Sequence, residues 1–137
     1  MATFRSFSQK RMDEMTEETL NAITNLTKTF DGSWGYEWVE VFPSLVNNQD
    51  CTKILKKSVE AINGSMIEIK EPFRWSEDFS YYLHQYPGAF FGLGAGMNHH
   101  VLHHPSYDFP DELIEYGIKI FKEIIRFTNE KYESDSS

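Results

Sequence analysis

The sequence predicts an α/β fold, in which amphipathic helices cover a small β-sheet. After residue 47, stretches with helical spacing of apolar residues alternate with short β-favouring stretches. Before that point, residues 2–42 have the pattern of a strand, a helix and a second strand. Hydrophobic residues make up 40% of the 137 positions, so the chain can build a packed core.

The first segment begins with "ATFRSF", residues 2–7, whose alternation and content of Thr and Phe predict a short strand. Ser8 can cap the helix that follows, and Gly32 is a typical stop signal. "GYEWVEVF", residues 35–42, alternates strictly before Pro43 and therefore predicts a second strand. The apolar residues of the intervening helix fall near one face: Met12, Met15, Ile23, Leu26 and Phe30.

The second segment predicts three more helices and two more strands. Asn48 or Asp50 can cap a helix that ends at "NG", residues 63–64, and Ser76 can cap another that ends at "YPG", residues 86–88. "SMIEIK", residues 65–70, and the apolar "AFFGLGAG", residues 89–96, predict strands. "ESDSS", residues 133–137, is expected to be a disordered tail. The last helix has the clearest stripe: Leu113, Ile114, Gly117, Ile118, Phe121, Ile124 and Ile125.

Charge and cysteine content narrow the class of protein. The net charge of −8 repels phosphate backbones, so nucleic acid is not an expected partner. We expect no membrane association either, because no stretch approaches the roughly 20 apolar residues of a membrane span. A single cysteine, Cys51, excludes an internal disulfide, and the first residues lack the apolar run of a signal peptide. The expected location is cytoplasmic.

Four of the five histidines lie in "MNHHVLHHPSYDFP", residues 97–110. Neutral imidazole is a common zinc ligand, and both His99–His103 and His100–His104 are four residues apart. However, Pro105 follows at once, so a loop is expected in place of a helix. The sequence has no HExxH or CxxC motif to complete a zinc site. Two interpretations stay open: a polar loop with incidental histidines, and part of a metal site.

The glycine-rich "GLGAG", residues 92–96, is not the GxGxxG pattern of dinucleotide-binding proteins, and it leads into the histidines instead of a helix. Small residues here, Gly94 and Gly96 among them, can let a substrate approach the main chain, or they can form a tight turn only. Glu77 and Asp78 stand where carboxylates cap a helix, so catalysis is not needed to explain them.

Two longer stretches carry a resemblance to a known family. "SEDFSYYLHQYPGAFFGLGAG", residues 76–96, and "LHHPSYDFPDELIEYGIKIFKEI", residues 102–124, resemble the C-terminal end of the two-metal aminoacylase and carboxypeptidase-type amidohydrolases, which include hippurate hydrolases and indoleacetyl-amino-acid hydrolases. The resemblance implies that residues 1–46 are the second half of a lid or dimerisation domain. Residues 47–132 would then be the C-terminal part of a zinc-peptidase-like hydrolase domain.

The resemblance also assigns residues to a site. His103 matches the metal-ligand histidine of the family, and His104 occupies the variable position beside it. His99 and His100 match no ligand of the family, so these two and His104 are at most auxiliary. Arg5 falls where a lid arginine can hold a substrate carboxylate. Ser76, Gly94 and Gly96 would line the substrate pocket, although Trp75 stands where many members have glycine.

The remaining ligands of the family are not in these residues. A histidine, a bridging aspartate, glutamates and the glutamate general base belong to an N-terminal part, so the resemblance implies roughly the last third of a metal-dependent amidohydrolase. The intact enzyme would hold two zinc or manganese ions and hydrolyse N-acyl amino acids or small peptide-like substrates. The isolated segment is expected to be inactive, to bind metal weakly or not at all, and to form homo-oligomers through its lid half. The alternatives are a non-catalytic dimerisation or assembly module and a histidine-rich metal-binding protein.

Overall fold

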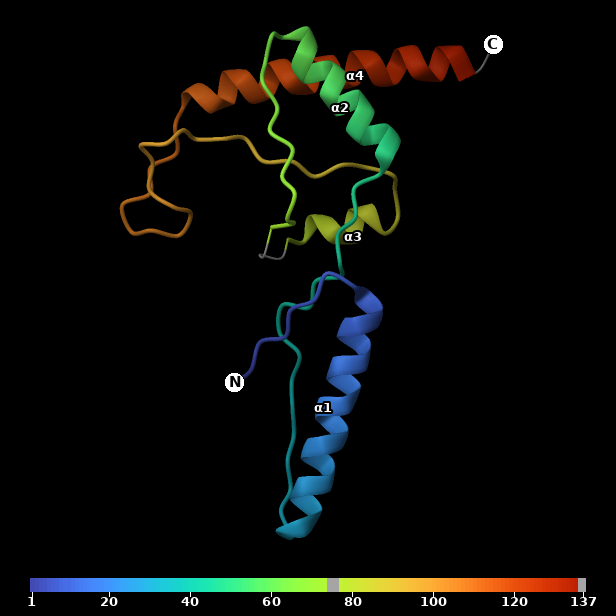
Figure 1. Ribbon diagram of the computed structural model, residues 1–137, viewed down its shortest axis with the longest axis vertical. Helices are drawn as coiled ribbons and strands as arrows, with labels where there is room; N and C mark the ends of the chain where they lie inside the picture. The colour runs from blue at the N-terminus through green and yellow to red at the C-terminus, as the bar shows by residue number, and fades with distance from the viewer. Residues whose placement is uncertain (74–76, 136–137) are drawn as a thin grey trace. The chain divides into compact units, whose positions relative to one another are not determined.

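The computed structural model describes residues 1–73 and 77–135 of the chain (Figure 1). Within these residues it contains four helices in the order α1 (Gln9–Thr29), α2 (Gln49–Ala61), α3 (Phe79–Leu83) and α4 (Glu112–Asp135). None of the helices is long and apolar enough to cross a membrane.

The predicted α/β class is wrong, because the described residues form helices and irregular segments with no strand. All four predicted strands, residues 2–7, 35–42, 65–70 and 89–96, are irregular. A strand needs a neighbouring backbone to exchange hydrogen bonds with, as well as a face to bury. The apolar side chains of residues 35–42 find no such face, since Val39 and Val41 are mostly exposed. The alternation in the sequence predicted strands, but in the described residues no neighbouring segment pairs with them.

The chain divides into two compact units. Unit 1 consists of Met1–Val46 and Ile69–Tyr86, and unit 2 of Asn47–Glu68 and Pro87–Ser137. The assignment of residues 1–46 to a lid and of residues 47–132 to a hydrolase domain stays a prediction.

Helix α1 of unit 1 follows the sequence signals closely. The Ser8 hydroxyl accepts a hydrogen bond from the Arg11 amide at 3.4 Å, which confirms Ser8 as the N-cap. At the other end, the Gly32 amide donates to the Thr27 carbonyl at 3.2 Å, so the helix ends where the glycine predicted. None of its residues is buried. The apolar stripe of α1 is therefore only partly covered: Met12 and Met15 are half-buried, whereas Leu26 is exposed.

The rest of unit 1 is held by aromatic rings and a few long-range hydrogen bonds. Tyr36 lies between Trp34 and Trp38, with ring centroids 5.5 and 5.4 Å away. The Tyr81 hydroxyl donates to the carbonyl of Val41. The Nε2 atom of His84 lies 3.0 Å from the Ser44 carbonyl oxygen, which ties α3 to the segment after Pro43. In the described residues of unit 1, ring contacts and single hydrogen bonds of this kind take the place of a continuous apolar core.

Unit 2 is built on the packing of α2 against α4 (Figure 1). Its buried apolar residues are Leu55 and Val59 from α2 and Ile120 from α4, and Ile62, Phe91 and Ile124 pack around them. Asn48 caps α2 by accepting hydrogen bonds from the amides of Asp50 and Cys51, as the sequence indicated. The helices of unit 2 were thus correctly predicted from their apolar spacing and caps.

Two further contacts join distant parts of unit 2. The side-chain amide of Asn47 bonds twice to Phe90: it accepts from the Phe90 amide at 2.8 Å and donates to the Phe90 carbonyl at 2.9 Å. Gly64 lies so close to Tyr116 that an added Cβ would stand 2.6 Å from the tyrosine hydroxyl. The first contact fixes the segment before α2, and the second requires glycine at the turn after it.

Candidate functional site

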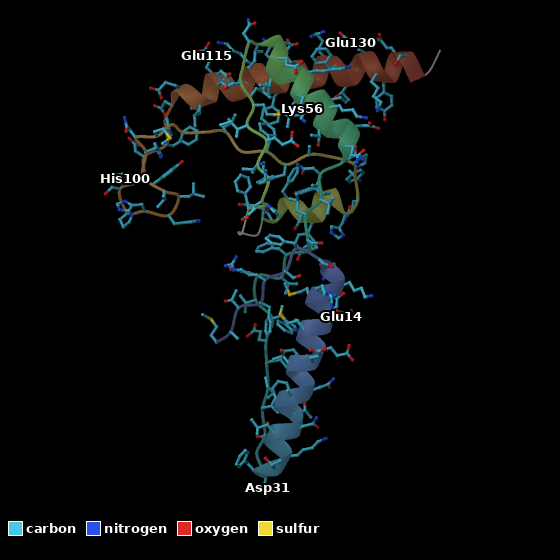
Figure 2. The ribbon with its side chains drawn as sticks, viewed as in Figure 1. Glu14, Asp31, Lys56, His100, Glu115 and Glu130 are labelled. Atoms are coloured by element: carbon cyan, nitrogen blue, oxygen red, sulfur yellow. The ribbon has the colours of Figure 1, made fainter. Side chains whose placement is uncertain are left out.

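The histidine loop, residues 97–110, joins the glycine-rich segment to α4 and contains no helix, as Pro105 predicted. Two turns shape it: the His104 amide donates to the Val101 carbonyl at 3.0 Å, and the Tyr107 amide donates to the His104 carbonyl at 2.9 Å. Figure 2 marks His100 on this loop. Because the loop is not helical, four-residue spacing does not by itself bring two imidazoles to one ion.

His103, the proposed ligand, is exposed and has a left-handed backbone with a φ of 69°. Positive φ is uncommon outside glycine, although histidine tolerates it better than most residues. Catalytic zinc sites take three protein ligands plus water. No group of three or more His, Cys, Asp or Glu side chains in residues 1–73 and 77–135 could hold a metal ion. The described residues therefore do not form a metal centre, and the role of His103 stays a prediction.

The other loop histidines make contacts that the sequence did not indicate. His100 and His104 stack with ring centroids 4.2 Å apart and planes 3° from parallel. Nitrogen lone pairs lie in the ring plane, so this stack does not direct two of them at one ion. The Nδ1 atom of His104 also accepts a hydrogen bond from the Ser106 amide at 3.0 Å. This arrangement favours neither residue as part of a chelating pair.

The predicted substrate-binding residues are scattered between the two units. Arg5 is exposed and belongs to unit 1, whereas Gly94 and Gly96 belong to unit 2. Gly94 has open space around it, and Gly96 has a φ of 94°, which glycine adopts readily. Ser76, like Trp75, lies outside the described residues. All four assignments stay predictions.

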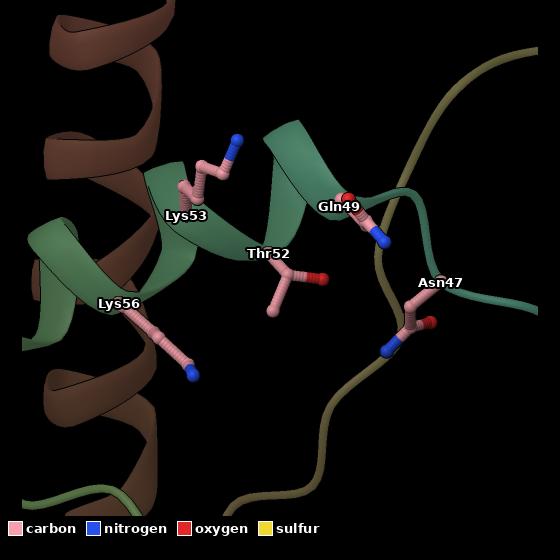
Figure 3. A pocket seen from close by; sticks show the side chains of 5 residues that line it. All are labelled: Asn47, Gln49, Thr52, Lys53 and Lys56. Atoms are coloured by element: carbon pink, nitrogen blue, oxygen red, sulfur yellow. The ribbon is translucent and has the colours of Figure 1, made fainter.

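Unit 2 has two shallow hollows on its surface. One, of about 380 Å³, lies beside the histidine loop and is lined by His99, Asp108, Phe109, Pro110, Asp111 and Glu112. The other, of about 250 Å³, lies along α2 and is lined by Asn47, Gln49, Thr52, Lys53 and Lys56 (Figure 3). Sequence reasoning missed the two lysines, and their three-residue spacing on an amphipathic helix was the signal for a shared face.

The charges along α2 are paired locally. The Lys53 ammonium lies 2.8 Å from Asp50, and Lys56 lies 3.2 Å from Glu68. The hydrogen bond and positive charge of Lys53, with a smaller contribution from Lys131, lower the pKa of Asp50. On α4, Lys119 lowers the pKa of Glu115 in the same way. These ion pairs are exposed to solvent, so they contribute to the surface of the helices and do not identify a reactive group.

Comparison with known proteins identifies the family. Residues 12–126 match the family described as Peptidase family M20/M25/M40. The match covers most of the chain, including the histidine loop, so the chain belongs to this family. The family resemblance drawn from the sequence is thereby confirmed.

The chain is also similar to several individual proteins. The chain is 30% identical over 122 residues to a protein of Synechocystis named "Probable hydrolase sll0100", covering 85% of the chain and 31% of that protein. It is 28% identical to N-acetyldiaminopimelate deacetylase of Bacillus subtilis, in a match that covers 86% of this chain and 31% of that protein. It is 31% identical to IAA-amino acid hydrolase ILR1-like 2 of Arabidopsis thaliana, in a match that covers 71% of this chain and 23% of that protein. The chain thus spans about a third or less of these relatives' length, and no solved structure matches it.

Proposed function

We propose that this chain is part of a metal-dependent amidohydrolase that cleaves the amide bond of N-acyl amino acids. The supporting observation is the family match over residues 12–126, which includes His103 and the loop around it. One relative is named as a hydrolase of IAA-amino acids and another as a deacetylase of N-acetyldiaminopimelate. Both names describe release of an acyl group from an amino acid, and we carry that reaction class to this chain.

In this proposal the chain supplies one ligand, His103, on an exposed loop. The other ligands and the general base would come from polypeptide that corresponds to the remaining two thirds of the relatives. No catalytic step is assigned to the described residues, because they hold no group of three possible ligands. We expect the 137 residues alone to be inactive.

The test uses the natural protein in which these residues occur, at the full length its gene encodes. Release of amino acid from N-acetyl and N-benzoyl amino acids is measured with added zinc or manganese, and again after chelation. We expect metal-dependent release that His103→Ala abolishes and that Met97→Ala, a fully exposed change in the same loop, leaves intact. Activity that survives both chelation and His103→Ala would exclude the proposal. Release by the 137-residue chain alone would exclude the expected inactivity.

A second candidate function is an assembly module, which the exposed apolar side chains of unit 1 favour. Leu26 on α1 and Phe30, its C-cap residue, are 60% and 75% exposed, and Val39 and Val41 in the segment after it are 73% and 57% exposed. Apolar surface of this kind is usually covered by another molecule or by more of the same chain. Sedimentation of the natural protein at several concentrations tests self-association. Replacing Leu26 and Phe30 together with Lys should shift an oligomer to monomer if this face is the contact.

A further inference from the structure

We propose that His99 is the positioning residue of the histidine loop. Through its Nε2 atom it ties residues 97–100, the first limb of the loop, to residues 108–110, the second limb. The consequence of this contact for catalysis rests on the proposed function, in which His103 binds a metal ion. His103 lies between the two limbs, so the contact would help to fix its position. The contact itself is argued from the loop alone.

The two ring nitrogens of His99 face two different main-chain oxygens. Its Nδ1 atom lies 2.8 Å from the His100 carbonyl oxygen, and its Nε2 atom lies 2.5 Å from the Asp108 carbonyl oxygen. The edge of the Tyr107 ring supports the imidazole, with centroids 4.8 Å apart and planes at 78°. His99 is half-buried, whereas most of the loop around it is exposed. One side chain therefore joins the start of the loop to its end.

Carbonyl oxygens only accept hydrogen bonds, so the contact with Asp108 requires the ring to carry an N–H group at Nε2. This is the contact that spans the loop, because the His100 carbonyl belongs to the neighbouring residue. His99 also borders a hollow that Asp108, Asp111 and Glu112 help to line.

Few other contacts hold the loop in its conformation. Between the limbs, the amides of His104, Ser106 and Tyr107 bond only to atoms within the loop. Loss of the His99 contacts would separate residues 97–100 from residues 108–110 and leave these local turns and the stack of His100 on His104. The left-handed backbone of His103 lies within the same stretch. The direction of the His103 side chain thus depends on a residue four positions earlier.

Four forms of the ¹⁵N-labelled 137-residue chain test the contact by nuclear magnetic resonance. His99→Phe keeps a ring beside Tyr107 but removes the ring nitrogens. His99→Arg restores N–H donors, because a guanidinium can donate to two carbonyls. Met97→Ala changes a fully exposed side chain in the same loop and serves as the matched control. The measured quantity is the hydrogen-exchange rate of the His104, Ser106 and Tyr107 amides, with circular dichroism confirming that the helices persist.

We expect His99→Phe to speed exchange of these three amides by about tenfold, because loss of one hydrogen bond worth about 1.4 kcal/mol gives that factor. His99→Arg should stay within about threefold of the parent chain, and Met97→Ala should match it. In the parent chain the ring of His99 should show contacts to Tyr107. Unchanged exchange in His99→Phe, equal acceleration in His99→Arg, or the absence of contacts between the two rings would overturn the proposal.

Zinc binding by the full-length natural protein, measured by calorimetry, tests the link to function. His99→Phe should weaken the affinity for zinc, and His99→Arg should restore most of it. If His103→Ala leaves zinc affinity unchanged, the ligand assignment fails, and the exchange rates of the loop amides still decide whether His99 holds the limbs. If His103→Ala abolishes zinc binding while His99→Phe leaves it unchanged, the positioning role is overturned and the ligand assignment stands.

Discussion

Replacement of Ile120 with alanine should weaken unit 2 more than the same change two residues earlier. Ile120 is 2% exposed and packs against Leu55 and Val59, whereas Ile118 on the same helix is 54% exposed. Both changes exchange isoleucine for alanine within α4, so their effect on helix propensity is the same and cancels in the comparison. The difference between them isolates the value of the α2–α4 contact.

The magnitude follows from the groups removed. Each change deletes three carbon atoms, and about 0.8 kcal/mol per buried methylene gives roughly 2.4 kcal/mol at the buried site. A residual cavity would raise that loss, but the small core can collapse, so we expect about 2–3 kcal/mol for Ile120→Ala. At half-exposed Ile118 about half the transfer energy applies, or roughly 1 kcal/mol. The expected difference is therefore about 1.5 kcal/mol.

Urea unfolding followed by the helical signal of circular dichroism provides the assay, with both variants measured beside the parent chain. If Ile120→Ala unfolds the unit in water, hydrogen exchange of the α2 amides gives the comparison instead. Equal losses for the two variants would refute the reasoning, because they would show that α4 does not pack on α2 through the face that contains Ile120.

Three other changes test contacts in unit 2. Gly64→Ala should cost about 1–3 kcal/mol of unfolding free energy, because the new Cβ would stand 2.6 Å from the Tyr116 hydroxyl; Tyr116→Phe in the same chain should recover part of the loss, and full tolerance of Gly64→Ala alone would contradict the close approach. Asn47→Ala should cost about 1–2 kcal/mol, since it removes two hydrogen bonds to the main chain, whereas Asn47→Asp, which keeps the acceptor and loses the donor, should fall between; thermal unfolding measures both. Asp50 has a lowered pKa because Lys53 bonds to its charged form. The pair therefore adds stability above the unfolded pKa of Asp50, and this stability is lost as the pH falls through the folded pKa. Asp50→Asn should flatten that part of the plot of unfolding free energy against pH, and an unchanged plot for Asp50→Asn in low salt would count against the pair.

The helices could be predicted because their signals are local. Ser8 and Asn48 each cap the helix that follows through side-chain atoms within three residues, and no distant segment is needed for that bond. The strands could not be predicted in the same way. Alternation in residues 35–42 states which side chains could share a face, but hydrogen bonds to a second backbone decide whether a strand forms. In the described residues that partner is absent.

Only part of the candidate site could be predicted from the sequence, for a similar reason. Pro105 was enough to indicate a loop, and the order of motifs around His103 was enough to indicate the family, which the match over residues 12–126 confirms. The stack of His100 on His104 and the two contacts of His99 depend on how the main chain turns between residues 97 and 110. No spacing rule describes such a turn, so His99 could not be distinguished from the neighbouring histidines by its sequence position.

The left-handed backbone at position 103 is easier for glycine than for any other residue, although histidine tolerates it better than most. A φ of 69° costs a non-glycine residue roughly 1 kcal/mol, which glycine would avoid. Histidine at this position therefore costs some local stability. Lineages that no longer use the side chain should replace this histidine with glycine early, while Pro105 and the capping residues persist. Survival of histidine in lineages that have demonstrably lost the activity would indicate that the ring has a second use.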